Sequence, residues 1–222
     1  MINKLHSLVR RVESGWDPIS IKYALSYSSR LGVVDARVVT VVENWLGGFD
    51  NRSVLDLGGG PGHYAVEFAR RGARVTWHDP SRNYARIVQE RAALAGVEIE
   101  CSLGYLEAAC KFKRNPFSLV FCRRSWCYCI DERKFAGLLY NLVAPGGVVY
   151  IECDTPEAST PTGWTYLRSI AYLRLGVRIG HPFPKHGRIA RLMQRYPIQE
   201  MWLDYRDATL DIVVLRKSNV AT

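Results

Sequence analysis

The chain has 222 residues, of which 48% are hydrophobic and 23% are charged, and its formal net charge is +9. This balance excludes a disordered or fibrous protein and predicts one domain with a full hydrophobic core. No apolar stretch approaches the roughly 18 residues that a transmembrane helix needs, and the N-terminus lacks the apolar region of a signal peptide. We therefore expect a cytoplasmic protein without membrane insertion.

The predicted elements begin with two helices, over residues 18–31 and 33–45, which could lie over the carboxyl end of a sheet. From Asp50 onward, short β-branched runs alternate with helix-like segments, which indicates repeated βα units around a mainly parallel sheet. Strands are predicted at 53–57, 74–78, 98–102, 117–122, 147–153, 198–205 and 209–217. Helices are predicted at 63–71, 81–95, 133–142 and 187–195, with Gly72 and Gly96 closing the first two.

The C-terminal third departs from a plain dinucleotide-binding fold. Residues 155–186 are rich in Pro, Thr, Gly and aromatic side chains, and the middle of this stretch, 163–176, is expected to be helical. We interpret it as an inserted cap. The last two strands are joined by the short, polar Arg206-Asp207, which favours an antiparallel hairpin at the sheet edge.

The scattered basic residues and the cysteines add little. An excess of positive charge favours anionic partners, either nucleic acid or a small molecule with a phosphate or carboxylate group. Because the basic runs are short and lie in different segments, most of them are expected to be solvated surface. The six cysteines are expected to be reduced, and since none of them form a CxxC pair, no metal site is predicted.

A glycine-rich turn follows the first predicted strand. Glycines 58, 60 and 62 in Val54-Leu-Asp-Leu-Gly-Gly-Gly-Pro-Gly let the backbone turn sharply and approach a ligand closely. A dinucleotide-binding loop would need a third small residue where His63 stands, and a phosphate-binding P-loop would need a following Gly-Lys-Ser/Thr. Neither pattern is present.

Three motifs together carry a family resemblance. Asp56-Leu-Gly-Gly-Gly-Pro-Gly62, Val75-Thr-Trp-His-Asp79-Pro-Ser and Leu142-Val-Ala-Pro-Gly-Gly147 follow one another in order. In this the chain resembles the class I S-adenosylmethionine-dependent methyltransferases, well over residues 50–153. The resemblance implies an enzyme with S-adenosyl-L-methionine as cofactor. It also implies a doubly wound α/β fold, with a seven-stranded, mainly parallel sheet and an antiparallel C-terminal hairpin.

The resemblance also implies a division of the single domain. Residues 1–49 would form an N-terminal helical cap, 50–153 the cofactor-binding core, 154–186 an inserted substrate cap, and 187–222 the final helix and hairpin.

The cofactor site follows from the resemblance. Asp79 would accept hydrogen bonds from the ribose hydroxyls. Asp56 would fix the loop or attract the cofactor's ammonium group. Where the family often has an acid after the third strand, this chain has Cys101-Ser-Leu-Gly-Tyr, so that backbone groups or Ser102 would have to bind the adenine. The full predicted set is Asp56, Gly58, Gly59, Gly60, Gly62, Asp79, Pro80, Ser102, Leu103, Cys122 and Arg123.

The acceptor is expected to be a small molecule, possibly anionic or aromatic, methylated at oxygen or nitrogen. Residues 123–129, after the fourth strand, contain neither the Asn/Asp-Pro-Pro-Tyr nor the Pro-Cys pattern of nucleic-acid base methyltransferases. The candidate acceptor residues are Tyr23, Tyr27, Arg124, Trp126, Tyr128, Trp164 and Tyr166, with core packing as the alternative for the aromatic ones. His181 and His186 are candidate general bases. An RNA or protein methyltransferase, and a non-catalytic adenosyl-binding scaffold, stay open as alternatives.

Overall fold

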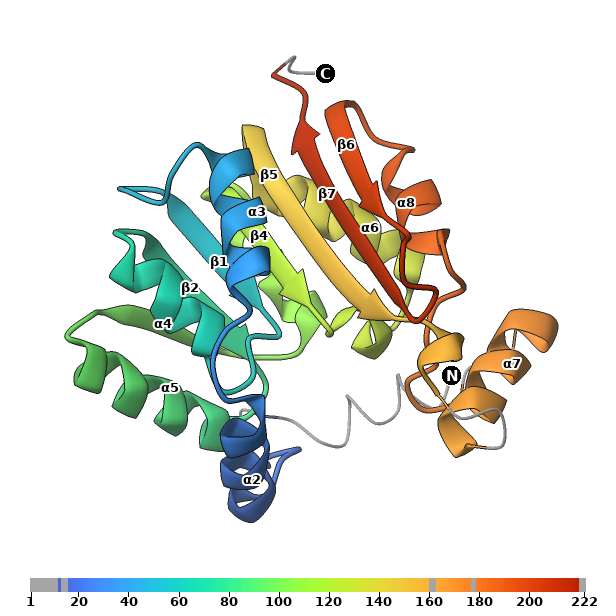
Figure 1. Ribbon diagram of the computed structural model, residues 1–222, viewed down its shortest axis with the longest axis horizontal. Coiled ribbons are helices and arrows are strands. Elements are labelled where there is room, and N and C mark those ends of the chain that lie inside the picture. The colour runs from blue at the N-terminus through green and yellow to red at the C-terminus, as the bar shows by residue number, and fades with distance from the viewer. Residues whose placement is uncertain (1–11, 13–15, 160–162, 177–178, 220–222) are drawn as a thin grey trace.

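The computed structural model describes residue 12 and residues 16–159, 163–176 and 179–219. Its seven strands form one sheet in the order β3-β2-β1-β4-β5-β7-β6 (Figure 1). Strands β1 to β5 run parallel, whereas β7 is antiparallel to both β5 and β6. The predicted mixed sheet with its C-terminal hairpin is confirmed. The strands are β1 (Ser53–Leu57), β2 (Arg74–Asp79), β3 (Ile99–Leu103), β4 (Phe117–Arg123), β5 (Val143–Asp154), β6 (Ile198–Asp204) and β7 (Leu210–Lys217).

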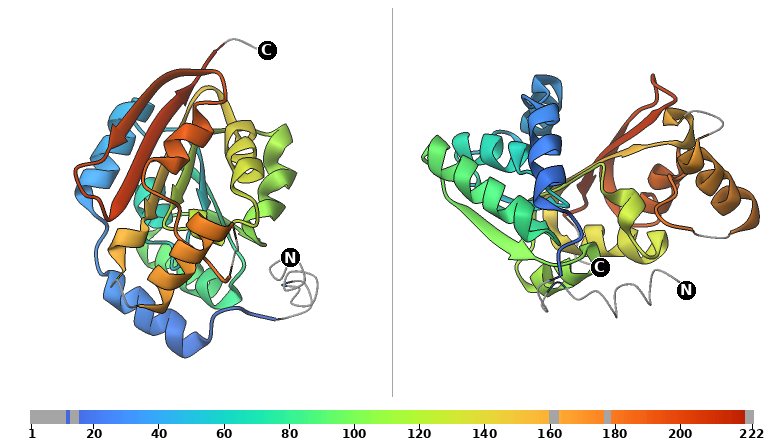
Figure 2. Two further views of the ribbon diagram at one scale, coloured as in Figure 1. Left: turned by 90° about the vertical axis from the view of Figure 1, so that its right-hand side faces the viewer. Right: turned by 90° about the horizontal axis from the view of Figure 1, so that it is seen from below.

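Helices cover both faces of the sheet (Figure 2). Helices α3, α4 and α5 pack on one face, and η2, α6 and α8 pack on the other. Among the described helices, none is both long and apolar enough to cross a bilayer. The helices are α2 (Ile21–Leu31), α3 (Ala36–Leu46), α4 (His63–Arg70), α5 (Arg82–Ala95), α6 (Glu132–Leu142), α7 (Trp164–Leu175) and α8 (Arg188–Met193), with 3₁₀ turns η2 (Leu106–Arg114), η3 (Trp126–Tyr128) and η4 (Pro156–Ala158).

Local sequence signals set the helix ends. The side chains of Asp35, Ser81 and Asp131 accept hydrogen bonds from backbone N–H groups in the first turns of α3, α5 and α6. Such N-caps satisfy donors that the helix itself leaves unpaired. Gly96 ends α5 in the left-handed conformation, with φ of 67°. The chain therefore returns to the sheet with its next strand in register.

The structure corrects the placement of one N-terminal helix. Only α2 lies at the carboxyl end of the parallel strands, whereas α3 crosses a face of the sheet (Figure 1). Val38, Val42 and Leu46 of α3 are buried in the same core cluster as Tyr150 of β5. Their spacing gives α3 an apolar stripe, which stabilises the helix only when it is buried against another apolar surface. The expectation that both helices lie over the sheet's end is therefore wrong for α3.

Strand β5 begins at Val143, four residues before its predicted start. The first part of the strand contains Pro145, Gly146 and Gly147. Because these residue types weaken strands, the sequence pattern favours a loop there. The division of the domain into four parts remains a prediction. Residues 1–11, 13–15, 160–162, 177–178 and 220–222, which belong to its caps and C-terminal part, lie outside the described residues.

Candidate cofactor and acceptor site

The glycine loop joins β1 to α4 at the carboxyl end of the sheet. The N–H of Gly58 donates to the carbonyl of His78 at 2.8 Å, and the indole N–H of Trp77 donates to the carbonyl of Gly60 at 3.0 Å. A Cβ atom on Gly59 would lie 2.4 Å from the Trp77 ring, whereas one on Gly60 would meet nothing within 4 Å. The loop is thus packed tightly against the protein at Gly59 and open at Gly60.

Asp79 connects this loop to the start of α5. It ends β2, next to β1 in the sheet, and is 8% exposed. Its Oδ2 accepts the N–H of Gly60 at 3.2 Å and its Oδ1 accepts the N–H of Ser81 at 3.0 Å. Burial raises the pKa of Asp79 to about 6, although the two N–H donors oppose this shift. Each oxygen keeps a second acceptor position, so the carboxylate can still receive hydroxyl donors.

Asp56 lies on the neighbouring strand and is 3% exposed. Its Oδ2 is buried without a hydrogen-bond partner among the described residues. Burial, followed by the charge of Asp79, raises the pKa of Asp56 to about 7, against the opposing charge of Arg123. An unpartnered buried oxygen costs free energy unless a ligand supplies a donor. A cationic donor such as an ammonium group fits this position.

A cavity of about 160 Å³ lies beside the loop. It is walled by the loop, by the connection between α2 and α3, and by the end of β4. That volume is below the roughly 300 Å³ of a typical ligand pocket, so it suits only part of a nucleoside cofactor. Its lining residues are Tyr27, Leu31, Val33, Val34, Asp35, Asp56, Gly58, Gly59, Gly60, Pro61, His63, Tyr64, Phe121, Arg123 and Arg124.

Two arginines of this cavity share one buried carboxylate. The Nε atoms of Arg123 and Arg124 lie 3.0 and 3.1 Å from the two oxygens of Glu152, which is 1% exposed. Arg123 also lies over the ring of Tyr64, at 5.0 Å from its centroid. Arg124 has a φ of 55°, a conformation that is unusual outside glycine and often found at functional sites. Arg124 also lies 3.9 Å from Asp154, so two acids balance the two arginines beside the loop.

Aromatic side chains from α2 lie near the same end of the sheet. Tyr23 and Tyr27 stack with their centroids 5.9 Å apart, and Tyr27 lies 6.3 Å from Tyr84 of α5. Tyr84 is linked to Asp79 through Ser81, whose N–H donates to Asp79 and whose hydroxyl accepts the N–H of Tyr84. Two of the predicted acceptor residues, Tyr23 and Tyr27, therefore lie near the predicted cofactor residue Asp79.

Known proteins share this domain. A methyltransferase-domain family model matches residues 54–147. A ubiquinone biosynthesis O-methyltransferase of Aeromonas salmonicida is 29% identical over 105 residues, which cover 47% of this chain and 44% of the relative. Residues 54–147 of this chain are therefore similar to a methyltransferase domain. The class I methyltransferases that its motifs resemble use S-adenosyl-L-methionine as their methyl donor.

Other relatives extend the comparison beyond residues 54–147. The tRNA (guanine-N(7)-)-methyltransferase of Myxococcus xanthus is 29% identical over 153 residues, covering 61% of this chain and 72% of that protein. An O-methyltransferase family protein from Burkholderia thailandensis has the same fold, with a TM-score of 0.67 at 18% identity over 88% of this chain and 60% of that one. The chain spans less than half the length of the ubiquinone relatives that it matches.

Ser102 does not face the candidate cofactor site. Its hydroxyl lies 2.8 Å from Nδ1 of the fully buried His78, whose Nε2 lies 2.9 Å from the carbonyl of Tyr105. Because alternate residues of a strand point to opposite faces, Ser102 faces the η2 side of the sheet, while Leu103 lies on the side of Asp79. We withdraw Ser102 as the adenine-binding side chain and retain Leu103.

Cys122 and Trp126 are core residues. The thiol of Cys122 lies 3.2 Å from the hydroxyl of Ser125. Trp126 packs against Phe135 at 5.2 Å and its indole N–H donates to Glu132 at 3.2 Å. Both Cys122 and Trp126 are 0% exposed in the core cluster beneath η3. Their predicted contacts with cofactor and acceptor are therefore replaced by the alternative of core packing.

The two candidate general bases lie in different surroundings. His181 is exposed, and its ring lies 4.6 Å from that of Tyr128, which is 55% exposed. Nδ1 of His186 lies 2.5 Å from a carboxylate oxygen of the buried Asp211, and its ring contacts Tyr205. Asp211 belongs to β7, which lies two strands beyond β4 from the glycine loop, so His186 is remote from that loop. Of the two histidines, only His181 contacts a predicted acceptor residue, Tyr128.

Trp164 and Tyr166 lie on α7, away from the loop. Trp164 is 66% exposed and Tyr166 is partly buried. A contact of either side chain with an acceptor remains a proposal.

Sequence reasoning missed Glu152 and Tyr64 in the candidate site. Glu152 stands near the end of β5 and could have been found by the rule that identified Asp56 and Asp79, because it too is an acid at the carboxyl end of a buried strand. Tyr64 directly follows the glycine loop, and nothing in the sequence indicates its contact with Arg123.

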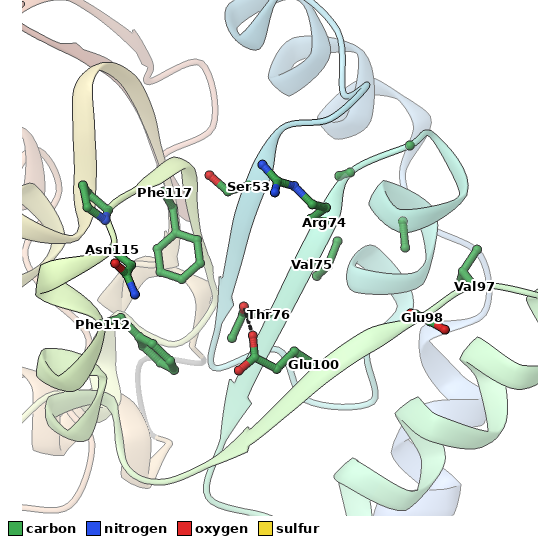
Figure 3. Close-up of a pocket in the computed structure, with 14 residues that line it drawn as sticks. Ser53, Arg74, Val75, Thr76, Val97, Glu98, Glu100, Phe112, Asn115 and Phe117 are labelled. Carbon is green, nitrogen blue, oxygen red and sulfur yellow. Dashed lines mark hydrogen bonds between the residues drawn. The ribbon is translucent and has the colours of Figure 1, made fainter.

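A larger hollow of about 720 Å³ lies at the opposite, amino ends of the strands (Figure 3). There Thr76 donates to Glu100 at 2.9 Å, and a guanidinium nitrogen of Arg74 lies 3.3 Å from the carbonyl of Asn51. Because these polar groups already bond one another and the hollow faces away from the loop, we do not assign it to the cofactor.

Proposed function

We propose that this chain transfers the methyl group of S-adenosyl-L-methionine to an oxygen or nitrogen atom of a small-molecule acceptor. The observation that carries the proposal is the pair of buried carboxylates, Asp56 and Asp79, at the ends of adjacent parallel strands beside a glycine loop that is open at Gly60. In open α/β sheets, ligands bind at the carboxyl ends of the strands where the strand order reverses, and β1 is that point here.

Different residues bind different parts of the cofactor. Asp79 accepts hydrogen bonds from the ribose hydroxyls, while Pro80 and Leu103 border the adenine. Asp56 offers its unpartnered Oδ2 to the ammonium group of the amino-acid part. Arg123, in the same cavity, pairs with the carboxylate of that part. When bound, the cofactor supplies an electrophilic methyl group on a positively charged sulfur.

The acceptor lies between the cofactor and the aromatic group. Tyr23, Tyr27 and Tyr128 offer ring faces to a flat acceptor, and Arg124 offers a guanidinium to an acidic substituent. His181, beside Tyr128, is placed to remove the acceptor's proton. The names of the ubiquinone O-methyltransferase relatives support a small-molecule acceptor.

RNA is the second candidate acceptor. The net charge of +9 and the similarity to the Myxococcus xanthus tRNA methyltransferase favour it. Binding of RNA would weaken steeply with salt, because neutralised phosphates release counterions. An aromatic acid would show a shallower salt dependence.

The first test is calorimetric titration of S-adenosylmethionine and S-adenosylhomocysteine into the wild type and Asp79→Ala. We expect binding to the wild type, weakened at least tenfold in the variant, which corresponds to about 1.4 kcal/mol or more. Asp207→Ala, in the exposed turn between β6 and β7, is the control and should bind normally. If neither ligand binds the folded wild type at millimolar concentration, the proposal fails.

The acceptor is then sought by turnover assays on aromatic acids, amines and RNA. Methylation of an aromatic acid that depends on Arg124 would support the small-molecule proposal. Cofactor binding without turnover on the whole panel would instead indicate a non-catalytic scaffold.

A further inference from the structure

Exposed apolar side chains gather at one end of the molecule. In the part of the chain that the structure describes, eleven large hydrophobic side chains are more than a third exposed, and only Leu94 among them belongs to the end where the parallel strands begin. Most of the others come from α2 and α7, which lie at the carboxyl end of the sheet (Figure 1). An apolar surface of this kind marks a contact with another apolar phase or molecule.

Helix α7 shows the clearest pattern. Trp164, Leu167 and Leu175 fall on one face at helical spacing and are 66, 50 and 74% exposed. On the other side of the helix, Ser169 is fully buried and the hydroxyl of Tyr172 donates to the buried Glu132 at 2.7 Å. The helix is therefore held in place by one side while its apolar stripe faces outward.

The same part of the sequence carries most of the net charge. Residues 158–199 contain seven Lys or Arg residues and no Asp or Glu, whereas the whole chain has a net charge of +9. Arg174, in the last turn of α7, is exposed beside the stripe. Trp and Leu side chains that face outward beside a basic residue can insert into a membrane interface. Basic residues near such a helix are attracted to anionic lipids.

We propose that the chain docks on an anionic lipid surface through the stripe Trp164–Leu167–Leu175 of α7, with the exposed Ile21 and Leu25 of α2 at the same end of the sheet. RNA fits this surface less well, because leucine side chains offer nothing to phosphates. A second copy fits less well too, because it would bring two segments of the same charge together. Docking would turn the carboxyl end of the sheet toward the lipid, and it does not depend on methyl transfer.

The test is sedimentation of the full chain with vesicles of phosphatidylcholine alone and of phosphatidylcholine with 30% phosphatidylglycerol. We expect binding to the anionic vesicles at least tenfold stronger than to the neutral ones, and weaker binding as salt rises. The variant Leu167→Ser/Leu175→Ser should bind the anionic vesicles at least tenfold less than the wild type. Leu94→Ser, which is 90% exposed at the other end, is the matched control and should bind normally.

Folding of the variants is checked by circular dichroism and thermal unfolding, since exposed leucines contribute little to the core. The proposal is overturned if the wild type does not distinguish the two kinds of vesicle, or if the double variant binds as well as the wild type. It is also overturned if the wild type ignores vesicles but binds an RNA transcript, or forms a dimer that the double variant abolishes. The last two results would assign the stripe to RNA or to a second copy.

Discussion

Gly60 is the residue at which the loop is open to a ligand. A Cβ there would touch nothing in the protein, and its φ is 51°, so Gly60→Ala should cost about 1 kcal/mol of folding stability and leave the fold intact. Because the new methyl group would occupy the space that the cofactor approaches, we expect at least tenfold weaker binding of S-adenosylhomocysteine by calorimetry. Gly96→Ala has the same open surroundings and a φ of 67°, but lies at the end of α5. It should lose similar stability and no affinity, and equal affinity losses in the two variants would argue against the assignment.

Asp56 makes cofactor binding depend on pH. Its raised pKa, about 7, means that the apo carboxyl group is increasingly protonated below neutrality and no longer attracts an ammonium group. The affinity for S-adenosylhomocysteine should therefore fall by up to about tenfold per pH unit as the pH drops from 7 to 5.5. Asp79, whose pKa is about 6, is also protonated in the lower part of this range, so the affinity falls more steeply there. Asp56→Asn should bind weakly and lose the dependence near pH 7; a wild-type affinity that is flat over this range contradicts the role.

The burial of single side chains separates what sequence could and could not predict of the site. Asp56, Asp79 and the glycine turn follow from motif and strand position. The surroundings of Ser102 and Trp126 depend on which face of a strand or turn they occupy. They also depend on hydrogen bonds to His78 and Glu132, which the sequence does not indicate. A pattern of residue types does not specify such tertiary hydrogen bonds.

At the scale of elements, Glu132 at the start of α6 holds the cap helix. It accepts from Tyr172 of α7 at 2.7 Å, and Nε of Arg188 in α8 lies 2.5 Å away. Removing one of these bonds in Tyr172→Phe should weaken the attachment of α7 by about 1 kcal/mol. Hydrogen exchange of α7 amides should then be about fivefold faster, with the core strands unchanged. Tyr166→Phe, on the same helix, has no such bond and should exchange like the wild type; equal acceleration in both would refute the anchoring.

The elements themselves were largely predictable, because β-branched runs, glycines and capping residues act locally. Predicted boundaries of β1, β2 and β4 lie within one residue of those observed, and α5 ends at Gly96 as expected. Two features were not local. The early start of β5 depends on its pairing with β4. The position of α3 depends on which face of the sheet has apolar side chains that the helix can bury. Tertiary contacts decide such cases.

At the scale of the whole molecule, burial of the Asp56 carboxyl group lowers the folding stability. Asp56 is protonated in the folded chain up to about pH 7 but only to about pH 4 when unfolded, so the folded state binds more protons in between. Folding stability is therefore lost as the pH rises toward 7, and the loss is complete above it. The charged carboxylate is buried without a partner, which is the state that a bound cation would relieve.

Asp56→Asn should accordingly be more stable than the wild type, and increasingly so as the pH rises. Other groups also titrate: His63, whose pKa burial lowers to about 4, destabilises the folded state below pH 6.5. The difference between variant and wild type isolates Asp56. In urea unfolding without ligand at pH 5, 6, 7 and 8, this difference in unfolding free energy should grow by about 1–3 kcal/mol from pH 5 to 7 and then level off. S-adenosylhomocysteine at 100 times its Kd should stabilise the wild type by about 2.7 kcal/mol and the variant far less. A difference that does not change with pH would show that Asp56 is already ionised in the apo fold. Its burial would then not lower the folding stability, and a bound cofactor would have no such loss to offset.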